Sequence, residues 1–167
     1  TLVQQNDVNR IGVGTPGDID SSAGVCIRAG NLPYKNTPLG PIISEALNMP
    51  VAIANDATAA LYGELYAGAG KAYQNIIMLT LGTGVGGGVI LNGTVLTGCA
   101  YGGAELGHMV IEKDGRPCSC GRNGCLEAYC AATALVKLTK EKFLECPDSL
   151  MVEMCEGDIN RVGGKTA

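Results

Sequence analysis

The stretch IIMLTLGTGVGGGVIL, residues 76–91, decides the fold class. Residues 76–81 are apolar and predict a buried strand, and residues 89–91 resume a strand after a run of glycines. Asn92-Gly93 then indicates a hairpin turn, with residues 94–96 as the partner strand. This part of the chain is therefore predicted to form a sheet with a glycine-rich connection between two of its strands.

That connection, residues 82–88, is a candidate phosphate-binding loop. Successive backbone N–H groups without side-chain bulk can surround phosphate oxygens. The loop is not a Walker motif, because no Gly-Lys-Ser/Thr follows it, and it is a poor dinucleotide fingerprint, because a strand rather than a helix comes next. A tight β-hairpin explains the same residues equally well. The candidate phosphate contacts are Gly82, Thr83, Gly84 and Gly86.

Upstream, two further buried strands are predicted, at residues 10–13 and 51–54. The second is followed by a predicted helix over residues 57–67. Another helix is predicted because several apolar residues share one helical face, namely Leu39, Ile42, Ile43, Ala46 and Leu47. Its expected N-cap is Thr37, with Pro38 at the first helical position. Strands that alternate with helices predict an α/β fold.

Asn55 and Asp56 follow the second of these strands and directly precede a helix. The carboxyl end of a strand is the usual position of a ligand site in an α/β sheet. Asp56 is placed to act as the base that phosphoryl transfer to a hydroxyl group requires. An equally good explanation from sequence is that Asp56 caps the helix that follows it.

A group of four residues forms a candidate zinc site, made of His108, Cys118, Cys120 and Cys125. Three thiolates and one imidazole are a common ligand set of structural zinc. Gly121 and Gly124 allow the loop to fold tightly enough for three sulfurs to converge. The alternatives are unrelated reduced thiols in a surface loop, or a zinc ribbon, which requires two more widely separated cysteine pairs.

The remaining cysteines are interpreted as ordinary core or surface thiols: Cys26, Cys99, Cys130, Cys146 and Cys155. An even total of 8 cysteines also suits a secreted disulfide framework. A length of 167 residues with 46% apolar residues predicts a packed core instead. We therefore expect a reducing, cytoplasmic location.

Two acidic residues lie close to the candidate zinc ligands in sequence. Glu105 precedes His108 in the same short segment, and Glu127 follows Cys125 near the start of a helix predicted over residues 126–138. Carboxylates accept hydrogen bonds from adjacent sugar hydroxyls. Negative charge in a first helical turn explains Glu127 equally well.

The charge balance argues against nucleic acid as a partner, because the net charge is -4 and the chain has no long run of Lys and Arg. No stretch approaches the roughly 18 uninterrupted apolar residues of a membrane span. The first residues do not have the pattern of a signal peptide. We therefore expect neither a nucleic-acid partner nor a membrane partner.

Taken together, these motifs resemble the ROK family (repressors, open reading frames and sugar kinases), and most of all its bacterial glucokinases. The resemblance runs from Gly12 to about Ala132. Its most specific part is Glu105-Leu106-Gly107-His108, followed by the cysteine loop and Leu126-Glu127. Its other parts are the glycine-rich loop and Asn55-Asp56-Ala57-Thr58-Ala59-Ala60.

The resemblance implies an α/β fold of the actin-like ATPase (ribonuclease-H-like) type, with two lobes flanking a cleft. Residues 1–70 would belong to the smaller N-terminal lobe, and residues 71–167 to the larger lobe. Asp56 would be the catalytic base, and one nitrogen of His108 would bind zinc while the other faces the sugar. The residues that would contact the sugar are Gly17, Asn31, Asn55, Asp56, Glu105, His108 and Glu127.

The activity that the resemblance implies is a hexose kinase, which moves the γ-phosphoryl group of ATP, with Mg²⁺, to the 6-hydroxyl of a hexose. Glucose is the expected substrate, zinc would be structural, and a homodimer is the expected assembly. Other functions stay open from the sequence. They are a kinase for fructose, N-acetylmannosamine or N-acetylglucosamine, a sugar-sensing repressor of the same family, and a zinc-binding interaction module without catalysis.

The sequence departs from the family pattern at both ends. The family's opening Asp-x-Gly-Gly-Thr phosphate motif is absent, and so is its later glycine-rich adenosine loop. We therefore expect that residues 1–167 are an internal fragment. Alone, this fragment is predicted to be inactive.

Overall fold

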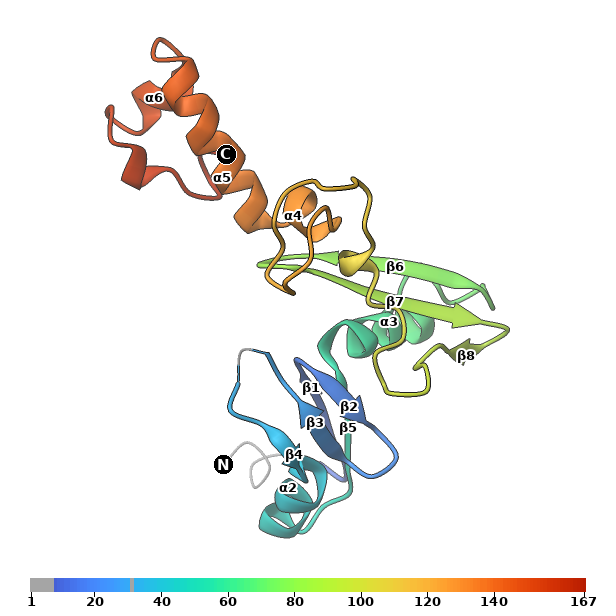
Figure 1. Ribbon diagram of the computed structural model, residues 1–167. Helices are drawn as coiled ribbons and strands as arrows, with labels where there is room; N and C mark the ends of the chain where they lie inside the picture. The colour runs from blue at the N-terminus through green and yellow to red at the C-terminus, as the bar shows by residue number, and fades with distance from the viewer. Residues whose placement is uncertain (1–7, 31) are drawn as a thin grey trace. The chain divides into compact units, whose positions relative to one another are not determined.

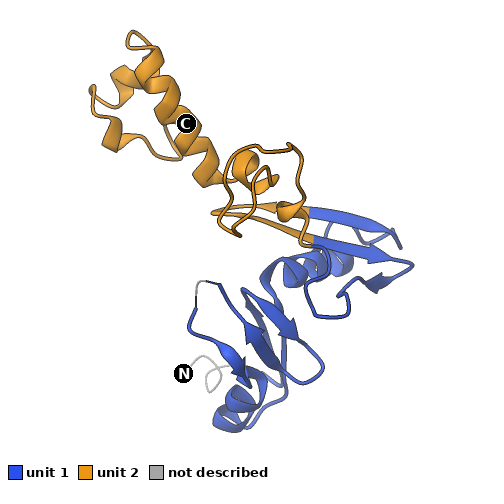
Figure 2. Ribbon diagram, viewed as in Figure 1, with its two compact units in different colours: residues 1–78, 88–104 blue, residues 79–87, 105–167 orange. Residues whose placement is uncertain are grey.

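The structure is a computed structural model that describes residues 8–30 and 32–167, and its helices and strands form a mixed α/β arrangement (Figure 1). It divides into two compact units, which Figure 2 colours separately. Unit 1 comprises residues 1–78 and 88–104, and unit 2 comprises residues 79–87 and 105–167. The expected lobe boundary after residue 70 stays a prediction.

Unit 1 contains the two upstream strands that the sequence predicted. Strand β1 (Ile11–Thr15) pairs in parallel with β5 (Val51–Asn55), so that Thr15 lies opposite Asn55 at their carboxyl ends. Helices α2 (Leu39–Leu47) and α3 (Asp56–Ala67) precede and follow β5. The core of this region is built from Ile19, Cys26 and Ile53, with Val13, Leu39 and Val51 packed against them.

A second small sheet in unit 1 was not predicted. It consists of the antiparallel strands β2 (Asp18–Asp20), β3 (Val25–Arg28) and β4 (Lys35–Thr37). Gly17 precedes β2 with a φ of 107°, and a Cβ atom there would lie 2.1 Å from the carbonyl oxygen of Arg28. Only glycine fits this position, because it combines a left-handed conformation with a close backbone approach.

The predicted N-cap of α2 was wrong. Pro38 occupies the N-cap position, without a side-chain capping bond, and Thr37 is the last residue of β4. The Thr37 hydroxyl accepts a hydrogen bond from the Lys35 N–H (3.2 Å), so this side chain serves the strand end instead.

The glycine-rich stretch lies in a sheet whose strand order is β6-β7-β8, with β6 at Ile76–Leu81, β7 at Val85–Leu91 and β8 at Thr94–Val95. Strand β7 begins earlier than predicted, so residues 86–88 belong to the strand and only Gly82–Gly84 form the turn. A Cβ atom on Gly88 would lie 2.7 Å from Cδ2 of the buried Leu61 in α3. This glycine therefore allows close packing between strand and helix rather than a loop.

The helix predicted over residues 126–138 is interrupted. Helix α4 (Glu127–Cys130) ends at Ala131, which is extended (ψ 156°), and α5 (Ala132–Glu145) begins directly after it. The N–H of Ala132 donates to the carbonyl oxygen of Gly82 (2.9 Å), so this backbone group bonds the glycine turn instead of continuing α4. Helix α6 (Leu150–Met154) follows α5. Unit 2 also contains two 3₁₀ turns, η1 (Leu106–His108) before the cysteine-rich loop and η2 (Ile159–Arg161) after α6.

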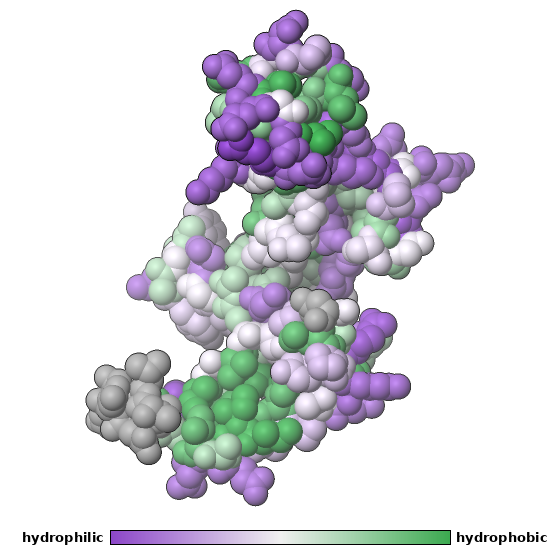
Figure 3. Space-filling view, turned by 90° about the vertical axis from the view of Figure 1, so that its left-hand side faces the viewer, coloured by the Kyte–Doolittle hydropathy of each residue, from purple (hydrophilic) through white to green (hydrophobic). Residues whose placement is uncertain are grey.

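The chain also has exposed hydrophobic surface. Figure 3 shows hydrophobic residues gathered on one face of unit 1. In β6, the residues Ile77 and Leu81 are 75% and 68% exposed. Apolar surface of this extent usually packs against another surface.

Within residues 8–30 and 32–167, no helix combines the length and apolar character needed to cross a membrane.

Candidate functional site

The four candidate zinc ligands converge in unit 2. The ligand atoms of His108, Cys118, Cys120 and Cys125 all lie within 4.8 Å of one another. His108 Nδ1 is 3.6 Å from the Cys118 sulfur, and the Cys120 and Cys125 sulfurs are 3.7 Å apart. A tetrahedral zinc ion with Zn–S bonds of about 2.3 Å requires a sulfur–sulfur distance of about 3.8 Å. The donor set and its spacing therefore fit a zinc ion.

The loop of residues 117–125, here called the zinc loop, is shaped by backbone bonds that need glycine. The Gly121 N–H donates to the Cys118 carbonyl (3.0 Å), and the Cys118 N–H donates to the Arg122 carbonyl (2.8 Å). Gly121 and Gly124 have φ values of 88° and 78°, in the left-handed region. These turns bring the three sulfurs together, as the sequence predicted.

A paired glycine substitution tests how tightly the zinc loop is packed. A Cβ atom on Gly124 would lie 1.7 Å from the Glu112 carbonyl oxygen, whereas one on Gly121 would meet nothing within 4 Å. Both alanines carry the left-handed penalty of about 1–2 kcal/mol, but only Gly124→Ala adds a backbone clash. We expect Gly124→Ala to lower the free energy of unfolding clearly more than Gly121→Ala, in urea titrations of the zinc-loaded protein. Equal losses would contradict this packing.

Tyr129 of α4 anchors the segment that leads into the zinc loop. Its hydroxyl accepts from the Arg116 N–H (2.7 Å) and donates to the Glu112 carboxylate. The Arg116 guanidinium lies 5.6 Å from the centre of the Tyr129 ring and forms an ion pair with Glu141 of α5 (3.3 Å). The hydrogen bond to Glu112 raises the pKa of Tyr129. The segment that leads into the zinc loop is thus attached to both α4 and α5.

The thiols differ in their ease of ionisation before metal is bound. Hydrogen bonds from the backbone and side chain of Arg122 lower the pKa of Cys120 to about 6. Burial raises the pKa of Cys125 to about 11, and Cys125 is fully buried. Because a thiolate is the form that binds metal, Cys125 must lose its proton when the ion binds.

Glu127 faces both the zinc loop and the glycine turn, Gly82–Gly84. Its Oε2 accepts from the Val85 N–H (3.0 Å), and its Oε1 accepts from the Ser119 hydroxyl (2.9 Å). Burial alone would raise the pKa of this carboxyl, but the bonds from Val85 and Ser119 and the nearby His108 outweigh it and lower the pKa. The carboxylate is therefore ionised and oriented. Neither the Ser119 hydroxyl nor the Val85 N–H was predicted as part of the site.

The glycine turn is tied to the start of α5. Besides the bond from Ala132 to Gly82, the Thr133 hydroxyl donates to the Thr83 carbonyl (2.9 Å). The Gly82 N–H bonds the Gly84 carbonyl within the turn (3.0 Å). Of the predicted phosphate contacts, Gly82, Thr83 and Gly84 lie in the turn, whereas Gly86 lies inside β7. Their contact with phosphate stays a prediction.

In unit 1, Asn55 connects the strand end, the next helix and the Gly17 turn. Its Oδ1 accepts from the N–H groups of Ala57 (2.9 Å) and Thr58 (3.2 Å), and its Nδ2 donates to the Gly17 carbonyl (3.1 Å). Asn55 is thus the N-cap of α3, and the alternative that Asp56 occupies this cap was wrong. Asp56 is the first residue of the helix, with an exposed side chain whose Oδ1 also accepts from the Ala57 N–H (2.9 Å).

The other residues predicted to contact a sugar are distributed as follows. Glu105 is exposed, and its carbonyl oxygen accepts from the His108 N–H (3.0 Å) at the start of η1. The predicted contact Asn31 lies outside the described residues. Unit 1 therefore holds Gly17, Asn55 and Asp56, and unit 2 holds Glu105, His108 and Glu127.

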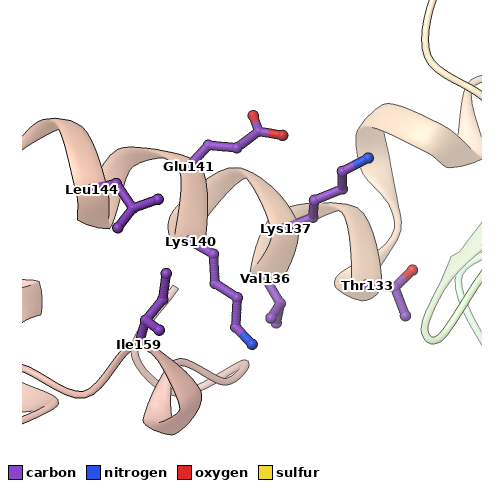
Figure 4. A pocket seen from close by; sticks show the side chains of 7 residues that line it. All are labelled: Thr133, Val136, Lys137, Lys140, Glu141, Leu144 and Ile159. Carbon is purple, nitrogen blue, oxygen red and sulfur yellow. The ribbon is translucent and has the colours of Figure 1, made fainter.

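A separate groove of about 400 Å³ follows one face of α5. Figure 4 shows that its lining includes the two cationic side chains Lys137 and Lys140 together with apolar Val136, Leu144 and Ile159. No residue of the zinc cluster lines this groove.

The chain has sequence relatives among both glucokinases and xylose repressors. The chain is 41% identical over 145 residues to the glucokinase of Thermotoga maritima. The matched region covers 86% of this chain and 46% of that protein. It is 40% identical over 152 residues to the xylose repressor of Bacillus subtilis. This matched region covers 89% of this chain and 39% of that protein. The chain thus spans less than half the length of these curated relatives.

The structure is similar to that of a ROK family glucokinase from Streptomyces griseus, solved in complex with glucose and AMPPNP. The TM-score is 0.84 at 33% sequence identity, over 98% of this chain and 53% of that one. The family model for "ROK family" matches residues 2–161. The chain therefore belongs to the ROK family.

Proposed function

We propose that this chain is part of an ATP-dependent hexose kinase that phosphorylates the 6-hydroxyl of its sugar, with glucose as the expected substrate. The observation that carries the proposal is the placement of Asp56. Its carboxylate is exposed at the carboxyl end of a parallel strand, next to a neighbouring asparagine that already caps the helix. A carboxylate that the cap does not require is available to accept a proton from a hydroxyl group.

In this proposal, the predicted polar side chains hold the sugar. Asn55 keeps one amide hydrogen beyond its bond to Gly17, and the Glu127 carboxylate can accept more bonds than those from Val85 and Ser119. The zinc ion would hold His108 in one tautomer and leave its other ring nitrogen as a donor to the sugar. The fold proposed for the full-length protein is the actin-like one, with two lobes flanking a cleft.

The nucleotide is assigned to the glycine turn. Gly82, Thr83 and Gly84 present backbone rather than bulky side chains, and their attachment to α5 keeps the turn in place before a ligand arrives. Bound Mg²⁺ would neutralise charge on the transferred phosphoryl group. Residues 82–84 would then hold the phosphates for transfer to the hydroxyl that Asp56 deprotonates.

A second candidate function is a sugar-sensing repressor. It is favoured by the xylose repressor of Bacillus subtilis, which is 40% identical to this chain, and by a ROK family transcriptional regulator whose structure matches with a TM-score of 0.76 at 31% identity. A sensor would use the same zinc loop and polar residues to hold a sugar, without phosphoryl transfer.

A substrate panel on the full-length protein tests the proposal. ADP formation would be measured with ATP, Mg²⁺ and glucose, fructose, N-acetylmannosamine, N-acetylglucosamine or xylose, and zinc content would be determined on the same sample. We expect the fastest turnover with glucose and one zinc ion per chain. Sugar-dependent thermal stabilisation without ADP formation would contradict the kinase and support the repressor.

A further inference from the structure

The Glu127 carboxylate bridges two segments of unit 2 that are far apart in sequence. One oxygen receives the Val85 N–H, which follows the glycine turn, and the other receives the Ser119 hydroxyl of the zinc loop. The Cys118 sulfur also lies 3.7 Å from the second oxygen. Hydrogen bonds to an ionised acceptor are stronger than neutral ones. Both oxygens of the Glu127 carboxylate are therefore held by hydrogen bonds, which fix its orientation.

The glycine turn is shaped to receive this carboxylate. A Cβ atom on Gly84 would lie 2.4 Å from Glu127 Oε2, whereas one on Gly82 would meet nothing within 4 Å. Neither glycine is among those with a positive φ, so alanine is conformationally acceptable at both positions. A side chain at position 84 would therefore displace the Glu127 carboxylate from the place it occupies.

We infer that Ser119 is a positioning residue: its hydroxyl orients Glu127 so that the carboxylate fixes the Val85 N–H and, through it, the glycine turn. Ser119 stands between Cys118 and Cys120, so an ion that orders these two sulfurs also orders the hydroxyl between them. The zinc loop thereby acts on the glycine turn as well as on a sugar. The consequence for nucleotide binding rests on the proposed function.

The bridge is compatible with a role of Glu127 in sugar binding. An ionised carboxylate offers about four acceptor positions, and Ser119 and Val85 occupy two of them. One carboxylate can therefore hold the turn and still accept a bond from a sugar hydroxyl.

The inference is tested by the amide resonance of Val85 in the zinc-loaded, full-length protein labelled with ¹⁵N-valine. Ser119→Ala is expected to move this amide proton upfield, because Glu127 loses its second anchor, while Ser119→Thr keeps a hydroxyl and the wild-type resonance. The KM for ATP should rise about 3–10-fold in Ser119→Ala, the range expected for one intramolecular hydrogen bond of average strength, with little change in Ser119→Thr. Zinc content should be equal in the wild type, Ser119→Ala and Ser119→Thr.

The glycine pair supplies an independent control. Gly84→Ala is expected to displace the Val85 resonance strongly, and Gly82→Ala to displace it much less. An unchanged Val85 resonance in Ser119→Ala overturns the inference, and so does loss of zinc from that variant, because the hydroxyl would then act on the metal site alone. If no hexose is phosphorylated, the proposed function fails, but the Val85 resonance still decides whether the bridge exists.

Discussion

Replacement of Asp56 by Asn in the full-length protein is expected to lower kcat for hexose phosphorylation by a factor on the order of 10²–10⁴, the usual contribution of a general base. An amide has nearly the same shape as a carboxylate but cannot take a proton from the hydroxyl. The fold should be retained, because Asn55 provides the cap of α3 and an asparagine at position 56 can still accept from the Ala57 N–H.

Steady-state kinetics with saturating glucose and ATP measure this effect. The matched control is Asp148→Asn, which removes the same charge from an exposed position in the loop between α5 and α6 and should leave kcat unchanged. The thermal midpoint of Asp56→Asn should remain close to that of the wild type. Wild-type turnover in Asp56→Asn would remove this residue from the role of base.

The second large effect is expected from loss of the zinc ion. Structural zinc binds small folded peptides with an apparent free energy on the order of 10 kcal/mol, and this energy is available for folding only while the ligands are intact. Cys125→Ser removes a fully buried ligand, so we expect zinc to be lost and the free energy of unfolding to fall by several kcal/mol. Removal of the ion by a chelator should have a similar effect without any substitution.

Zinc content and amide hydrogen exchange check this prediction. Exchange should accelerate over residues 105–127 when the ion is removed, whereas β1 and β5 of unit 1 should keep their protection. The control is Cys146→Ser, since Cys146 is exposed and lies outside the cluster, and its effect should stay within about 0.5 kcal/mol. A chelated protein with unchanged exchange over the zinc loop would show that the ion does not order it.

The elements that could be predicted from the sequence are those whose signal is local. Strands β5 and β6 and helix α3 lie within a residue of their predicted bounds, because each is a continuous apolar or helical pattern with a clear flanking signal. The sheet of β2, β3 and β4 was missed because its strands are short and partly polar. These strands are specified by pairing across the sheet, for which one sequence contains no periodic signal.

The same distinction applies to the site. The cluster of candidate zinc ligands could be predicted because His and Cys are rare and chemically specific, and the structure brings all four residues together. The bond between Glu127 and Val85 could not be predicted, since it depends on where β7 begins. Within the same strand, the missing side chain of Gly88 accommodates Leu61 of α3. A run of glycines is ambiguous until its packing partner is known.

The zinc loop has a consequence for how such proteins diversify. Its backbone is determined by four ligands and two left-handed glycines rather than by a hydrophobic core. Substitutions in the polar residues around it can therefore accumulate over evolutionary time without unfolding the loop. Under the proposed function, a sugar site supported in this way can acquire a new carbohydrate preference while the scaffold persists. It can equally pass from turnover to signalling, which fits a lineage whose members include both catalysts and regulators of transcription.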